Sequence, residues 1–229
     1  SWAGQHPGPV AVGVLVAAAA VLVPSMRRLL PVGVFRAAPG VATVVACRGL
    51  LAGTFFTANA YLPLMLTSTY HWSLTAAGTP LVVSALGWSA ASAWQGNHPD
   101  LPRPRLLRIG FGLVVIGLVG LVTVAAGWVP GWLALPVWAA AGVGMGLGFS
   151  AVSFLLLQVS GPSEVGFNSS AAQMSDQLST ATMIGFGGAL LMLLGSPVVA
   201  LPVLLGLLVG LGGGGAALAG RTRAQLGPA

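Results

Sequence analysis

Six long apolar runs constrain this chain more than any other feature. They cover residues 41–68, 74–94, 106–127, 132–159, 165–194 and 197–219. A helix needs about 20 mostly apolar residues to cross a bilayer, and each run reaches that length. Membrane β-strands are about 10 residues long and alternate between polar and apolar positions, which these runs do not. The sequence therefore predicts an all-α integral membrane protein, a six-helix transmembrane bundle.

Composition excludes a soluble domain. Hydrophobic residues make up 56% of the chain and charged residues 5%, and the mean hydropathy is +0.93. A soluble domain has roughly 25% charged residues. The net charge of +6 comes from arginines in short loops, which indicates membrane orientation rather than a nucleic-acid partner. The single cysteine, Cys47, cannot form an internal disulfide, and no Cys/His cluster predicts a metal site or a cofactor.

The arginines also predict the domain organisation and the orientation. Eight of the nine lie in the loops before the first run, after the second and after the last: Arg27, Arg28, Arg36, Arg103, Arg105, Arg108, Arg221 and Arg223. Such an excess marks the cytoplasmic side. We expect a terminal or partial transmembrane helix of a preceding region at 1–23, a basic cytoplasmic linker at 24–40, the bundle at 41–219 and a cytoplasmic tail at 220–229. The opening at Ser1, in mid-pattern, suggests a piece of a longer protein.

Glycines are concentrated in the fourth and sixth runs. Gly142, Gly144, Gly146 and Gly148 are spaced for close approach of helix backbones, as are Gly206 and Gly210. Two interpretations stay open for the fourth run: a flexible helix that forms a gate, or plain close packing. The polyglycine at 212–215 predicts a loosened helix end.

Two charges lie inside the predicted spans, where charge is costly. Arg48 is about two turns into the first span, and Asp176 is about three turns into the fifth. Both spans start on the cytoplasmic side, so an Arg48–Asp176 ion pair is one expectation. The alternative is that Arg48 extends to the interface while Asp176 faces a water-filled cavity.

The fifth span carries a polar stripe. Ser169, Gln173, Asp176 and Thr180 fall at i, i+4, i+7 and i+11, on one helical face. Lipid is a poor environment for such a face. It predicts either a cavity-lining helix with Asp176 as a protonatable group, or hydrogen bonding to other helices, including a missing partner domain. On the first span, Asn59 shares a face with Arg48 and is a further candidate.

An intramembrane serine protease is a poor alternative. Ser150 follows Gly148-Phe149, but a serine nucleophile needs a base within hydrogen-bond reach. The three histidines, His6, His71 and His98, precede it and lie in loops. We therefore expect no enzymatic activity.

Several segments together resemble one family. They are residues 27–31 (RRLLP), 48–56 (RGLLAGTFF), 60–64 (AYLPL), 87–88 (GW), 94–96 (WQG) and 166–172 (GFNSSAA). In this order they are similar to the C-terminal half of a bacterial, actinobacterial-type major facilitator superfamily transporter of the multidrug-efflux class. Relatives commonly have an acidic residue at the position of Asn59, and the family's N-terminal half is absent.

The resemblance implies a function. It implies proton-coupled efflux (antiport) of small drug-like or amphipathic solutes across the cell membrane, with the missing N-terminal half as partner. Alternating access between two six-helix bundles would move the solute. Asp176, Arg48, Asn59, Gln173, Ser169 and Thr180 are then the candidates for the substrate and proton pathway. The alternative is a membrane permease component or a non-transporting membrane subunit.

The arginine asymmetry makes a topology prediction. In a variant without Cys47, a cysteine introduced by His71→Cys should react with a membrane-impermeant maleimide in intact cells. A cysteine introduced by His98→Cys should react only after permeabilisation. The opposite pattern of labelling would refute the orientation.

Overall fold

The computed structural model describes residues 33–36 and 38–225, and its regular structure in these ranges is helical throughout. Six helical spans are long and apolar enough to cross a membrane. The elements are η2 (Val34–Arg36), α2 (Val41–Tyr70), α3 (Leu74–Ala77), α4 (Thr79–Gly96), α5 (Arg103–Ala125), η3 (Gly131–Leu133), α6 (Ala134–Val159), α7 (Val165–Leu194) and α8 (Pro197–Gln225). The predicted six-helix bundle is confirmed. The predicted helix at 1–23 lies outside the described residues, as do Arg27 and Arg28.

Two local features differ from expectation. The second span is divided at Gly78 into α3 and α4, because Pro80 enters the first turn of α4 without a backbone N–H. The polyglycine is not a loosened end, since α8 continues through it as far as Gln225. The absent side chain of Gly215 lets α8 lie directly against the ring of Phe111 on α5. Tertiary packing there outweighs the low helix propensity of glycine.

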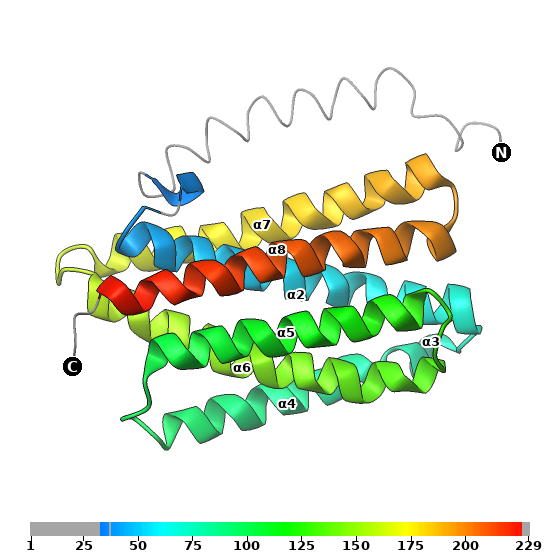
Figure 1. The fold of residues 1–229 in the computed structure, drawn as a ribbon, viewed down its shortest axis with the longest axis horizontal. Coiled ribbons are helices and arrows are strands. Elements are labelled where there is room, and N and C mark those ends of the chain that lie inside the picture. Colours follow the sequence, from blue (N-terminus) through cyan, green and yellow to red (C-terminus); the bar gives the residue numbers. More distant parts are fainter. Residues whose placement is uncertain (1–32, 37, 226–229) are drawn as a thin grey trace.

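The spans run antiparallel, so that their connections gather at two ends. Figure 1 shows the starts of α2, α5 and α7 and the end of α8 at one end of the bundle. The turns α2–α3, α5–α6 and α7–α8 lie at the other. Arg36, Arg103, Arg105, Arg108 and Arg221 belong to the first end. Trp128 and Trp132, which are 76% and 58% exposed, belong to the second, as expected for an aromatic belt.

Helix α2 is the centre of the bundle. It contacts α5, α6, α7 and α8. In its apolar stretch 72% of the residues are buried, against 6% in α7. The end of α2 away from the arginines is held by Tyr70, whose hydroxyl donates to the Val124 carbonyl at 2.8 Å and also to the carbonyl of Val129. The central position of α2 means that Thr43, Thr54 and Thr57 are buried against other parts of the protein.

The glycines of α6 face two different neighbours. A Cβ at Gly142 would overlap the carbonyl oxygen of Ser84, and one at Gly146 would lie 2.5 Å from that of Trp88, both on α4. A Cβ at Gly144 would lie 2.6 Å from the carbonyl oxygen of Gly110 on α5. Small residues here let three helix backbones meet, which is the close packing that membrane helices use.

This contact predicts a site-specific effect of one methyl group. Gly142→Ala should lower the free energy of unfolding by about 1–3 kcal/mol, because the new Cβ meets backbone that cannot rotate away. Gly112→Ala is the matched control, since nothing lies within 4 Å of a Cβ there. It should be neutral or stabilise by up to about 1 kcal/mol through helix propensity. Unfolding in mixed micelles measures both, and equal effects would contradict the packing argument.

Candidate functional site: an ion pair among α2, α6 and α7

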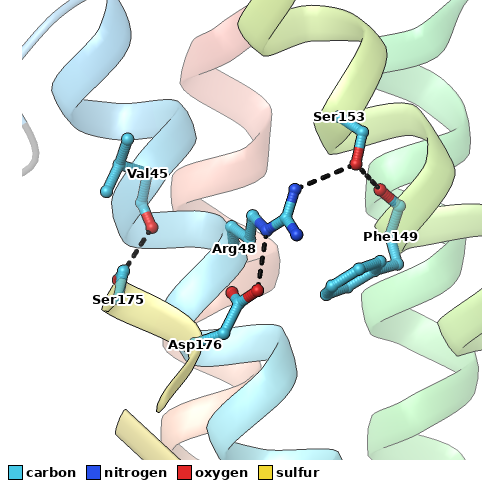
Figure 2. Close-up of polar contacts among 6 residues, drawn as sticks. All are labelled: Val45, Arg48, Phe149, Ser153, Ser175 and Asp176. Carbon is cyan, nitrogen blue, oxygen red and sulfur yellow. Dashed lines mark hydrogen bonds and ion pairs between the residues drawn. The ribbon is translucent and has the colours of Figure 1, made fainter. Parts of the chain in front are cut away.

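The two charges inside the spans meet. Arg48 on α2 donates from Nε to Oδ2 of Asp176 on α7 at 2.9 Å, as Figure 2 shows. The two side chains are 13% and 12% exposed. The structure therefore has the ion pair, and Arg48 does not extend alone to the interface. Pairing compensates for the cost of removing two charges from water.

Small residues on α2 make this meeting possible. A Cβ at Gly49 would overlap Ser175 Oγ, and a Cβ at Gly53 would lie 2.8 Å from Met183 Sδ, both on α7. Ser175 Oγ donates to the Val45 carbonyl at 3.2 Å (Figure 2). Gly49 and Gly53 thus allow α7 to pack closely against α2, and this close packing places Asp176 beside Arg48.

Arg48 has a second set of contacts, on α6. Its Nη1 donates to Ser153 Oγ at 3.0 Å, and Ser153 Oγ donates to the Phe149 carbonyl at 2.9 Å. The guanidinium carbon lies 4.3 Å from the centre of the Phe149 ring, a cation–π contact. One side chain therefore connects α2, α6 and α7 (Figure 2).

Asp176 is only half satisfied. Its Oδ2 accepts from Arg48, whereas Oδ1 is buried without a hydrogen-bond partner among the described residues. A buried acceptor without a donor is costly in a medium of low dielectric constant. Oδ1 is therefore a buried acceptor whose hydrogen-bonding capacity is unused among the described residues.

The predicted polar stripe is not buried as a unit. Asp176 is buried, Ser169 and Thr180 are half-buried, and Gln173 is exposed. The face of α7 turned to the bundle includes Ser175 instead. In the part of the chain that the structure describes, the side chains of Ser169, Gln173 and Thr180 make no hydrogen bond.

Asn59 lies on α2 farther from the arginine-rich end than Arg48. Its Oδ1 accepts from Trp138 Nε1 on α6 at 3.0 Å. The Trp138 ring stacks on Phe55 at 4.9 Å between centroids, and Phe55 packs edge-on against Trp88 of α4 at 5.8 Å. Trp88 in turn lies 5.6 Å from Phe149, the ring that Arg48 covers.

These contacts form a continuous aromatic wall. We use this name for the rings of Phe55, Phe56, Trp88, Trp138 and Phe149, which come from α2, α4 and α6. The ion pair lies at one end of the wall and Asn59 at the other. Phe56, Trp88, Phe149 and Asn59 are partly exposed, so the wall is accessible from outside this bundle.

Sequence reasoning did not assign Ser153, Phe149 or Trp138 to the site. Ser153 and Phe149 are spaced i, i+4 on α6, but nothing in that spacing points to Arg48, more than 100 residues away in the chain. The Gly49–Gly53 spacing was a usable signal, because small residues four apart indicate a helix contact.

Comparison with known proteins assigns no family. Neither a scan against models of protein families nor a search of curated proteins finds a match to this chain. The six apolar spans are those of a multi-pass membrane protein and are compatible with a membrane transporter or permease. No group of three or more His, Cys, Asp or Glu side chains that could bind a metal occurs in ranges 33–36 and 38–225.

The ion pair predicts strong coupling between its members. Arg48→Met and Asp176→Asn should each lower the free energy of unfolding by about 3–5 kcal/mol, because each leaves a buried partner unpaired. The double variant should lose clearly less than the sum. Unfolding in mixed micelles completes the cycle.

The matched control combines Arg48→Met with Gln173→Met. Gln173 is exposed on the same helix as Asp176 and is not among the hydrogen-bond partners of Arg48 in the described residues. This second cycle should be additive within about 0.5 kcal/mol. Additivity in the Arg48–Asp176 cycle as well would mean that the pair contributes no coupling.

Proposed function

We propose that this chain is the C-terminal six-helix half of a major facilitator superfamily transporter. In this proposal it exports small hydrophobic or amphipathic solutes in exchange for protons, by alternating access with a second bundle. Such a mechanism needs a solute site and a coupling group near the middle of the membrane, at the interface of two bundles.

The observation that carries the proposal is the uncovered polar face of α7. Gln173 and Gln177 are exposed. At about 1.5 Å per residue they lie roughly 12 and 18 Å beyond Val165, well inside a hydrocarbon core of about 30 Å. Amide groups are not stable against lipid at that depth, so they require a water-filled cavity or a partner protein. A second bundle across a solute cavity would supply both.

The ion pair suits a coupling role. Protonation of Asp176 at its free Oδ1 would weaken the attraction that holds Arg48 toward α7. The hydrogen bond to Ser153 and the cation–π contact with Phe149, both on α6, would then be the main interactions of Arg48. A proton would thereby change the contacts among three helices, which is the kind of two-state element that coupled transport needs.

The aromatic wall suits the proposed solutes. The partly exposed side chains of Trp88 and Phe149 offer apolar area to a hydrophobic solute, and the Trp88 ring could also attract a cationic one. Asn59 at the far end of the wall supplies a polar group for orientation. The rival proposal, a permease component, would use a separate energy source such as a partner ATPase instead of Asp176.

The proposal predicts that the isolated chain does not transport. Reconstituted alone in vesicles with a proton gradient, residues 1–229 should not move a fluorescent cationic dye. Co-reconstitution with a second six-span bundle that completes the proposed transporter should give gradient-dependent efflux. Asp176→Asn should abolish that efflux, whereas Ser170→Ala, an exposed exchange on the same helix, should retain it. Dye transport by the isolated chain would falsify the half-transporter proposal.

A further inference from the structure

A groove lies between α5 and α8 at the arginine-rich end of the bundle. Its volume is about 480 Å³, and it is lined by Arg105, Arg108, Ile109, Ala216 and Ala217. Two arginines of α5 therefore lie beside a shallow apolar surface. We call this surface the apolar floor; it is formed by Ile109 of α5 and by Ala216 and Ala217 of α8. Arg221 is exposed one turn beyond Ala217 on α8 and adds a third positive charge at this end.

The two arginines of the groove have no counterion in the described part of the chain. The whole sequence holds only three acidic residues, and the one among them that forms an ion pair there, Asp176, pairs with Arg48. Arg105 and Arg108 are exposed, and their side chains make no ion pair or hydrogen bond within ranges 33–36 and 38–225. The positive charge of the groove must be balanced from outside the chain.

Arg103, the third arginine of α5, shows the contrast. It is buried, donates from Nη2 to the Pro99 carbonyl at 3.2 Å and lies 4.7 Å over the ring of Phe154. Its charge is used to hold the α4–α5 connection against α6. Arg105 and Arg108 instead line the groove together with Ala216 and Ala217 of α8.

We propose that this groove binds an anionic phospholipid. Arg105 and Arg108 lie one helical turn apart, so that both guanidinium groups can donate to one phosphodiester, and arginine suits phosphate geometry. They are roughly 3 and 8 Å beyond the start of α5, the depth of lipid headgroups. An acyl chain would then pass over Ile109 and Ala217, where the small residues Gly213 and Gly214 continue an open face of α8.

A lipid fits these observations better than a soluble anion. Inorganic phosphate would use the two arginines but leave the apolar floor uncovered. An anionic lipid satisfies both, and anionic headgroups are what basic pockets between membrane helices bind on the cytoplasmic side. The inference is independent of the transport proposal, because it depends only on α5, α8 and their membrane depth.

The test uses a photoactivatable phosphatidylglycerol with its reactive group in the acyl chain. The full chain is reconstituted in phosphatidylcholine vesicles that contain a small fraction of this probe, and cross-linked peptides are identified by mass spectrometry. Cross-links should concentrate on the segments that contain Ile109 and Ala217. Excess unlabelled phosphatidylglycerol should compete, whereas excess phosphatidylcholine and millimolar inorganic phosphate should not.

The variant Arg105→Gln/Arg108→Gln should reduce cross-linking in the groove at least about fivefold, with cross-links elsewhere on the chain unchanged. Arg36→Gln is the matched control, since it removes an exposed charge at the same end of the bundle but in η2. It should leave the groove signal intact. Equal labelling of the double variant, an equal loss in Arg36→Gln, or competition by inorganic phosphate would each overturn the proposal.

Discussion

The close approach of α7 to α2 is the contact on which the rest of the candidate site depends. The hydrophobic effect does not drive helices together inside a bilayer, because lipid tails are as apolar as the helices. Van der Waals contact between helix backbones must therefore supply much of the attraction. Gly49 and Gly53 permit that contact, and Ser175 adds a hydrogen bond across it. Once α7 is held there, Asp176 has one position relative to α2, and Arg48 is the cation within reach.

The arginines show how neighbours decide what one residue type does. Arg48 is surrounded by three helices and is fixed by a carboxylate, a hydroxyl and an aromatic ring. Arg103 is also buried, but it lies at the α4–α5 connection and stabilises it. When the Gln95 amide is oriented to satisfy its neighbours, Gln95 Oε1 accepts a hydrogen bond from Arg103 Nη1 at 2.9 Å. Arg105 and Arg108 lie on the exposed surface, and their side chains have no partner in the described part of the chain. Burial and depth in the membrane therefore give these arginines different roles. Arg48 connects three helices, Arg103 stabilises a loop, and Arg105 and Arg108 form the proposed lipid site.

Two surfaces of the bundle differ in polarity and therefore suit different surroundings. The groove between α5 and α8 is apolar with charge only at headgroup depth, which lipid satisfies. The exposed side of α7 carries Gln173 and Gln177 where the hydrocarbon core is expected, which lipid does not satisfy. The bundle thus has one side suited to the bilayer and another suited to a protein or a water-filled cavity. This asymmetry, together with the half-satisfied Asp176 on the inner face of α7, is the physical basis of the transport proposal.

The sequence by itself determined the six spans, their order and the two charges within them. Length and apolarity are local properties, and a charge inside a span is rare enough to be singled out. It did not determine that Ser153 and Phe149 complete the Arg48 site, that α8 stays helical through four glycines, or that Gln173 turns outward while Asp176 turns inward. Those outcomes depend on which helix faces pack together. Packing joins residues more than 100 positions apart, so only the tertiary structure decided them.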